Sequence, residues 1–194
     1  MTTYRVVSGD SAVRIHARSS LHAIDGHAGD VSGTVDLEVV DGIVRRLLAG
    51  HLEVPVSSLR SGNVLEDSEL QRRVDARRFP TIVGEVRSAE VLELLDDGGR
   101  FRVDGDLTFH GVTQPVTGEL RITREGGAGA RDRVRVEGEQ VFDVREFGVN
   151  PPRILLLRVD PEVRVDISLR LSLDLDLDLD VDLDLDVDLD LERA

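Results

Sequence analysis

The sequence of 194 residues contains no cysteine, no tryptophan and no lysine, and its aromatic residues are five phenylalanines and one tyrosine. The lack of cysteine excludes disulfides, thiolate metal ligands and a cysteine nucleophile. Because aromatic residues are scarce, the core must be built mainly from valine, leucine and isoleucine, and 40% of all residues are hydrophobic. Valine packs well on the pleated surface of a sheet, so this composition favours a β fold.

Sequence signals of catalysis and targeting are missing as well. The chain has no G-x-S-x-G motif, no phosphate-binding loop and no dinucleotide-binding fingerprint. No apolar run approaches the roughly 18 residues that a transmembrane helix needs. The opening MTTYRVVSGD has neither the basic nor the apolar region of a signal peptide. We therefore expect one cytoplasmic domain that does not insert stably into a membrane.

The negative charge is unevenly distributed along the chain. The formal net charge is -14, and residues 174–194 contain nine Asp, one Glu and one Arg, which gives -9. The other 173 residues therefore carry only -5. A mildly acidic body with an acidic end argues against nucleic acid or an anionic membrane surface as a partner.

The clearest structural signal lies in residues 100–122, RFRVDGDLTFHGVTQPVTGELRI. Hydrophobic side chains recur at alternate positions from Phe101 to Phe109, with polar or charged residues between them, which is typical of a half-buried strand. Gly111 begins a reversal, and the alternation resumes after Pro115. The segment is predicted to be an antiparallel hairpin with one apolar and one polar face.

Other segments repeat this pattern or interrupt it. Asp41-Gly42 indicates a type I′ turn, because both central positions of that turn need a positive φ. Leu65, Leu70 and Val74 recur near helical spacing, which predicts one short helix near residues 66–76, capped by Asp67 or Ser68 and ended by Pro80. Strands are predicted over residues 4–18 (bent or broken at Gly9 and Asp10), 34–40, 43–56, 81–95 and 163 onward.

Several motifs resemble those of the YceI family, lipocalin-like bacterial barrels that bind polyisoprenoid lipids. GDLTFHGVTQPV resembles the family segment G-D-L-T-x-x-G-V-T-x-P-V, and DSELQRRVDARRFPTI resembles a second segment, although Glu69 stands where the family has His. Arg145, Phe147 and Gly148 match a third, in which Glu146 replaces Asp. The resemblance covers about residues 4–171.

This resemblance implies an all-β, eight-stranded antiparallel lipocalin-like barrel over residues 1–173, with a slender bore. The implied function is non-catalytic binding, storage or transport of a long isoprenoid, such as a polyprenyl phosphate or an isoprenoid quinone, without a cofactor. The apolar residues expected to line the bore are Val13, Ile15, Val35, Leu37, Leu52, Val54, Ile82, Phe101, Val103, Leu107, Phe109, Leu120, Phe147, Val165 and Ile167.

Arg145 is the candidate for binding a phosphate or quinone head group, because its guanidinium offers two parallel donors. An ion pair with a nearby Asp or Glu is the alternative role for this residue. Gly84, Gly105 and Gly118 lie at strand positions where they either leave the bore open or mark β-bulges.

Two other functions stay open. An enzyme of lipid or isoprenoid metabolism would need titratable groups, but alternation places His16, His51, Asp106 and His110 on the outer face. Such an enzyme would use His22 and His27, which lie in a predicted loop with Asp25 and Asp30. This cluster is the only plausible metal site in the sequence, although it lacks tight ligand spacing.

The other alternative is a structural or interaction module that acts through residues 174–194. There every even position from 174 to 190 is Asp, and the odd positions are Leu or Val. A strand continuing from residue 163 would be about 95 Å long, several times the usual length. We expect this tail to be disordered or to extend the last strand, and a homodimer paired through it is possible.

Overall fold

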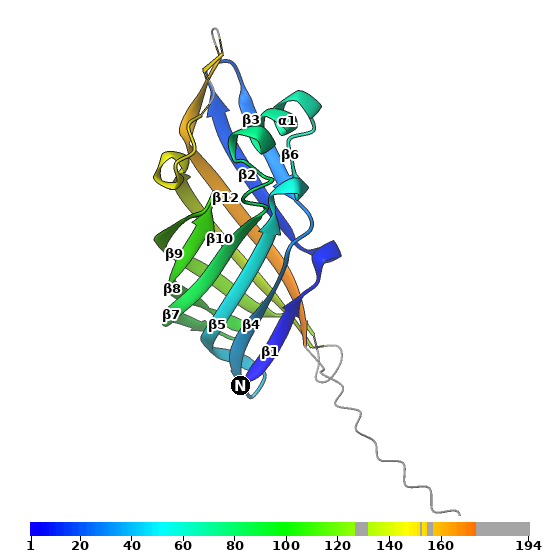
Figure 1. The fold of residues 1–194 in the computed structure, drawn as a ribbon. Coiled ribbons are helices and arrows are strands. Elements are labelled where there is room, and N and C mark those ends of the chain that lie inside the picture. The colour runs from blue at the N-terminus through cyan, green and yellow to red at the C-terminus, as the bar shows by residue number, and fades with distance from the viewer. Residues whose placement is uncertain (127–131, 152, 155–156, 174–194) are drawn as a thin grey trace, which may run out of the picture.

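The structure is a computed structural model that describes residues 1–126, 132–151, 153–154 and 157–173. Eight strands form a closed antiparallel ring, and β1 closes it by pairing with both β4 and β12 (Figure 1). This confirms the predicted all-β, eight-stranded fold. In ring order the strands are β1 (Thr2–Val6), β4 (Ser32–Val40), β5 (Ile43–Pro55), β7 (Thr81–Leu95), β8 (Gly98–Phe109), β9 (Val112–Arg124), β10 (Arg133–Asp143) and β12 (Leu157–Leu173).

The long strand β12 extends beyond the closed ring. Its C-terminal end pairs with β1, whereas its earlier residues pair with β2 (Ala12–Ser19). The 3-10 turn η1 (Ser8–Asp10) separates β1 from β2, as the interruption at Gly9 and Asp10 predicted. β3 (Ala23–Ala28), β6 (Leu59–Arg60) and β11 (Arg153–Ile154) complete this extension.

The predicted loop around His22 and His27 is therefore largely wrong, because β3 occupies most of it. Ile24 and Ala28 face inward while Asp25 and His27 are exposed, so the segment does alternate. The signal is weak in the sequence because Gly26 and two alanines carry too little hydrophobic surface to mark a buried face.

One end of the ring, here called the base, is closed by the β4–β5 hairpin. Asp41 and Gly42 have φ values of 51° and 80°, as expected for the predicted I′ turn. The Cβ position of Gly42 lies 2.8 Å from Nη1 of Arg124 on β9, so the hairpin tip reaches across the base. Pairing of β5 with β7 ends at Gly50 and Val86.

A buried polar cluster ties the base together. The fully buried Tyr4 hydroxyl donates to Asp132 Oδ2 (2.7 Å), and Arg124 Nε donates to Asp132 Oδ1 (2.6 Å). The backbone N–H of Leu173 donates to the carbonyl oxygen of Asp132 (3.2 Å). Asp132 therefore links β1, β9 and β12 at the point where the ring closes.

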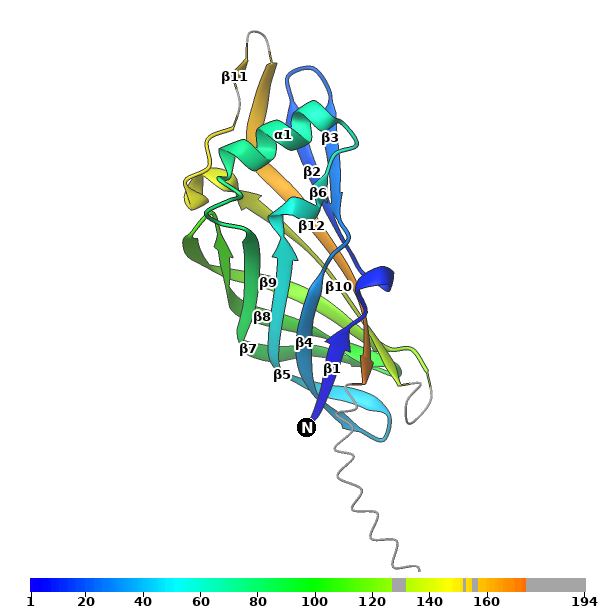
Figure 2. The same cartoon turned by 45° about the vertical axis from the view of Figure 1, so that its right-hand side comes forward.

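The other end of the barrel is covered by a helix. α1 spans Val64–Arg73, two residues earlier than the predicted start, because Asn63 is the residue that caps it. Asn63 Oδ1 accepts from the N–H of Leu65 (3.0 Å), while Asp67 instead accepts from the N–H of Ser61 (2.7 Å). α1 follows β6 and the 3-10 turn η2 (Val56–Ser58), and it lies across the end of the barrel opposite the N-terminus (Figure 2). No helix in the described ranges is long and apolar enough to cross a membrane.

Candidate functional site

The interior of the barrel contains an apolar cavity of about 390 Å³. Most of the side chains predicted to line the bore form its wall. They are Val13, Ile15, Val35, Leu52, Val54, Ile82, Val103, Leu107, Phe109, Leu120, Phe147, Val165 and Ile167.

The two other predicted residues belong to the packed base. Leu37 and Phe101 are fully buried within the core cluster. Alternation identifies the inward face of a strand, but it does not show how far along that face the open space extends. The β4–β5 hairpin crosses the base, and the inward-facing side chains near it therefore pack into the core. They do not line the open cavity.

Glycines create part of the cavity. Five consecutive strands of the ring each place one glycine in its wall, namely Gly50, Gly84, Gly105, Gly118 and Gly138. A Cβ atom built on Gly84 would find only the Cβ of Leu52, at 4.0 Å. A methyl group or a larger side chain at this position would therefore occupy cavity space. The expectation that Gly84 leaves the bore open agrees with this geometry.

A Cβ atom on Gly105, in contrast, would lie 2.3 Å from the carbonyl oxygen of Glu85. A register shift follows at Val86 and Ser88 on the facing strand. Only a residue without a side chain fits so close to the neighbouring backbone. Gly105 therefore marks a β-bulge, which was the alternative role predicted for these glycines.

One inward-facing polar side chain was missed by the sequence reasoning. Gln140 lines the cavity, and its Oε1 lies 3.1 Å from the Cβ position of Gly118. The sequence pattern could have identified this residue. Gln140 is an even-numbered position of β10, as are Val134 and Val136, which are buried on the same strand. Gln140 gives the otherwise apolar wall one amide that can bond to a polar atom of a ligand.

The cavity reaches the end of the barrel at α1, here called the mouth. Leu70 of α1 lines the cavity and is 36% exposed. Phe147, in the 3-10 turn η3 (Val144–Phe147), packs against Phe109 with ring centroids 5.9 Å apart. His110 Nδ1 lies 3.0 Å from the carbonyl oxygen of Phe147, and Phe79 packs edge-on against the His110 ring. These contacts form an aromatic rim.

Arg145 also lies at this rim but is engaged in an ion pair. Its Nε donates to Asp143 Oδ1 (2.9 Å), and a second nitrogen donates to the other carboxylate oxygen. The hydrogen bonds from Arg145 hold the pKa of Asp143 below its usual range. The structure thus shows the ion pair that was the alternative role of Arg145. By contrast, Arg78 at the same rim stacks over the Phe79 ring at 5.1 Å from its centroid.

Of the three histidines that alternation placed outside, His16 and His51 form contacts on the outer surface, whereas His110 lies in the β8–β9 turn with a φ of 51° and belongs to the aromatic rim. His16 bridges Asp25 (2.6 Å) and Asp166 (2.9 Å) between β3 and β12. His51 lies 3.2 Å from Glu53 and 3.5 Å from Glu85. In the ranges that the structure describes, no group of three or more His, Asp or Glu side chains could hold a metal ion. The contacts of Asp25 are with His16, so the proposed cluster of His22 and His27 does not form around it.

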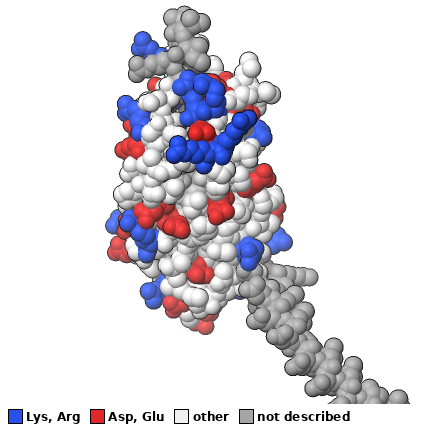
Figure 3. Space-filling view, viewed as in Figure 1, with Lys and Arg blue, Asp and Glu red and all other residues white. Residues whose placement is uncertain are grey.

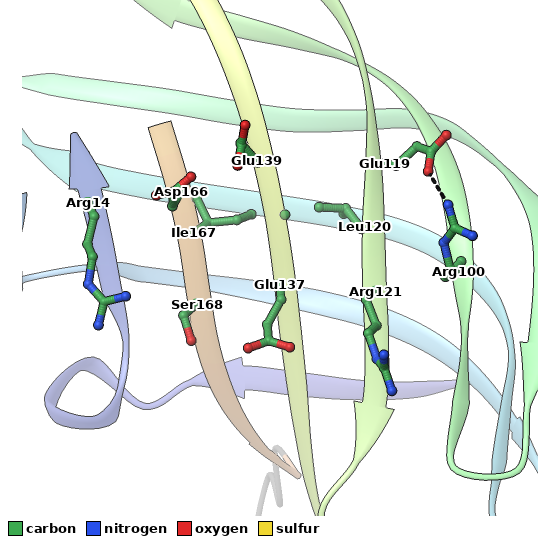
Figure 4. A pocket seen from close by; sticks show the side chains of 11 residues that line it. Arg14, Arg100, Glu119, Leu120, Arg121, Glu137, Glu139, Asp166, Ile167 and Ser168 are labelled. Carbon is green, nitrogen blue, oxygen red and sulfur yellow. Dashed lines mark hydrogen bonds and ion pairs between the residues drawn. The ribbon is translucent and has the colours of Figure 1, made fainter. Parts of the chain in front are cut away.

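A second hollow, of about 470 Å³, lies on the outer face of β9, β10 and β12. Figure 4 shows charged side chains spread across these strands, and Arg100 and Glu119 form a 2.7 Å ion pair there. Leu120, Gly138 and Ile167 border both this hollow and the interior cavity. Because most of its charged side chains are exposed and come from several strands, the hollow lacks the buried, convergent groups of a reactive site.

A model of one protein family, described as a YceI-like domain, matches residues 4–171. The chain belongs to the YceI family. At the two departures from the family motifs, Glu69 pairs with Arg72 and Arg73 on α1 (2.9 and 2.6 Å), and Glu146 lies within η3. Membership of this family points to a binding protein more than to an enzyme.

Several solved structures share the fold at low sequence identity. BcnA of Burkholderia cenocepacia is 16% identical with a TM-score of 0.68, covering 85% of this chain and 98% of that one. A polyisoprenoid binding domain from Saccharophagus degradans is 12% identical with a TM-score of 0.65, covering 89% and 99%. The YceI protein of Campylobacter jejuni is 16% identical with a TM-score of 0.62, covering 77% and 84%. A comparison with curated proteins finds no match.

Proposed function

We propose that this YceI-family protein binds one long isoprenoid chain in the barrel cavity, for storage or transport, without reacting with it. The observation that carries the proposal is the continuous apolar wall, which extends from the packed base to the mouth at Leu70. Each buried CH₂ contributes about 0.8 kcal/mol, so a few isoprene units offset the cost of ordering a flexible chain. The name of the Saccharophagus domain supports this ligand class.

The chemistry of the wall favours binding over catalysis. His51, Glu85 and Asp106 border the cavity, but strand alternation directs their side chains outward, where His51 contacts Glu85 and Asp106 pairs with Arg87. General acid and base catalysis needs a titratable group within hydrogen-bonding reach of the reacting atom. The inward amide of Gln140 suits recognition of a carbonyl or hydroxyl oxygen, as on a quinone or an alcohol, because it can both donate and accept.

Organic extraction of the purified full chain followed by mass spectrometry tests the proposal directly. An isoprenoid lipid is expected in the extract. Gly84→Leu should reduce the retained lipid more than tenfold, since the new side chain displaces about three CH₂ groups at about 0.8 kcal/mol each.

Two control variants separate loss of space from loss of folding. Gly84→Ala should retain most of the lipid and melt no lower than the wild type, because alanine is favoured over glycine within a strand. Glu85→Leu places the same leucine side chain at the next position, on the outer face of the barrel. This variant should retain all of the bound lipid. An extract without isoprenoid, or equal losses from Gly84→Leu and Glu85→Leu, would refute the proposal.

A further inference from the structure

The mouth end of the barrel exposes large aliphatic side chains that do not pack into the core. Val64 and Leu65, in the first turn of α1, are 77% and 80% exposed, and Leu21 in the β2–β3 turn is 67% exposed. None of the three belongs to the core cluster. Figure 2 shows that this turn and α1 project from the same end. We call these three residues the apolar tips. Solvent-facing helix positions are normally polar, so the tips indicate a partner with apolar character.

The helix that carries two of the apolar tips also contributes to the cavity wall. Leu70, which lies on the same helix as Val64 and Leu65, is both part of the cavity wall and exposed to solvent. A surface that contacts α1 therefore also borders the opening through which an apolar chain enters. This arrangement lets a lipid move between the partner and the cavity with little exposure to water.

The charges at this end favour an anionic surface. The acidic side chains of α1 are engaged locally: Asp67 accepts from Ser61, and Glu69 pairs with Arg72 and Arg73. Arg77 and Arg78 are exposed, and no described acidic side chain pairs with either, although Asp75 lies close in sequence. Figure 3 shows arginine side chains gathered over this end of the molecule.

We propose that the mouth end docks on the surface of a bilayer containing anionic lipids. The apolar tips enter the interface between head groups and acyl chains, and Arg77 and Arg78 contact the lipid phosphates. Small apolar insertions combined with basic side chains are the usual physical basis of reversible membrane association. The inference rests on the proposed function, because it gives the cavity a source and an acceptor for its lipid.

The acidic net charge does not prevent this docking. The acidic residues 174–194 join the barrel at Leu173, at the base end of β12, which contains 17 residues. At about 3.3 Å per residue this strand separates the two ends by roughly 55 Å. Charges are screened over about 8 Å at physiological ionic strength, so a membrane at the mouth senses the arginines there and little of the charge at the base.

Co-sedimentation with vesicles tests the proposal. The full chain is mixed with vesicles of pure phosphatidylcholine or of phosphatidylcholine containing one quarter phosphatidylglycerol. We expect binding to the anionic vesicles that weakens as salt is added. Arg77→Gln and Arg78→Gln should each lower the association constant about fivefold. The double variant Val64→Ser/Leu65→Ser should abolish the binding that remains at high salt.

Matched controls lie at the base. Val91→Ser/Leu94→Ser removes two exposed aliphatic residues there, and Arg133→Gln removes an exposed arginine that has no acidic partner in the described ranges. These variants should bind vesicles like the wild type. Failure of the wild type to bind anionic vesicles, equal binding to neutral ones, or equal losses in the base variants would overturn the proposal.

Lipid extraction from the same preparations distinguishes this proposal from the proposed function. The α1 and arginine variants should still yield bound isoprenoid, because their substitutions leave the cavity wall intact, while their rate of lipid transfer to vesicles falls. If the wild type yields no isoprenoid but binds anionic vesicles through α1, docking is correct and the cavity ligand is wrong. Variants that lose vesicle binding and also unfold, as judged by circular dichroism, are replaced by Leu65→Gln alone.

Discussion

At the scale of single residues, the polar groups of the base show how a small fold closes a ring of strands. Tyr4 and Asp132 are far apart in sequence, yet their hydrogen bond joins the first strand to the residue that precedes β10. Arg124 satisfies the second oxygen of the Asp132 carboxylate. A buried charged group is stabilising only when all of its hydrogen-bond partners are present, so each member of this cluster depends on the others.

We expect Tyr4→Phe to lower the free energy of unfolding by about 1–3 kcal/mol at neutral pH, because it leaves a buried carboxylate oxygen of Asp132 without its donor. Burial and the neighbouring Asp132 carboxylate raise the pKa of Tyr4. The unfolded tyrosine ionises near pH 10, whereas the folded one stays neutral, so the wild type loses stability as the pH rises above about 10.

Phenylalanine does not ionise, and the gap in stability between the variant and the wild type should therefore narrow between pH 10 and pH 11. Urea titrations of both proteins at neutral and alkaline pH provide the measurement. A gap that stays constant across this range would show that Tyr4 ionises equally in the folded and unfolded states.

At the scale of secondary-structure elements, the sequence predicted most strands because alternation is a local property. β8, β9 and the I′ turn at Asp41-Gly42 were found in this way, whereas β3 was missed because small side chains give it little contrast. Bulges were the other limit. Two register shifts each leave one extra residue on β5, Leu48 and Arg45, opposite β4. They change the phase of the strand, so that Leu47 is buried although strict alternation with Leu52 and Val54 would direct Leu48 inward.

The β4–β5 hairpin gives a prediction for the base. Gly42→Ala should lower the free energy of unfolding by about 1–3 kcal/mol, because residue 42 has a φ of 80° and the new methyl group would crowd Arg124. Gly9→Ala is the matched control, since a Cβ atom there meets nothing within 4 Å and the φ of Gly9 is not positive. Thermal unfolding followed by circular dichroism measures both. Similar melting temperatures for the two variants would mean that the hairpin tip contributes little to closure.

At the scale of the whole molecule, the barrel has two unlike ends. The base is packed and tied by buried polar contacts, whereas the mouth has an aromatic rim, a helix with exposed aliphatic residues and the exposed arginines Arg77 and Arg78. Alternation within single strands could not reveal this difference between the two ends, because it depends on which strands meet when the ring closes. The family resemblance supplied the barrel, but the engagement of Arg145 by Asp143 and the exposure of Val64 and Leu65 required the three-dimensional structure.

The acidic tail proposed at residues 174–194 lies outside the described residues, and its prediction rests on the sequence. Nine aspartates alternate with leucine or valine there. Ionised aspartates repel one another at neutral pH, and their protonation near pH 4 removes this repulsion while the apolar stripe is kept. Such alternating segments then pair as intermolecular sheet.

We therefore expect the full chain to associate as the pH falls from 7 to 4, and a chain ending at Leu173 to stay monomeric over the same range. Light scattering at matched concentrations gives the comparison, and at neutral pH both proteins should retain the same amount of extractable lipid. Added salt should favour association of the full chain already above pH 4, since it shortens the reach of the repulsion. If the two chains scatter equally at every pH, or if removing the tail changes lipid retention at pH 7, the tail is not the passive appendage that its composition predicts.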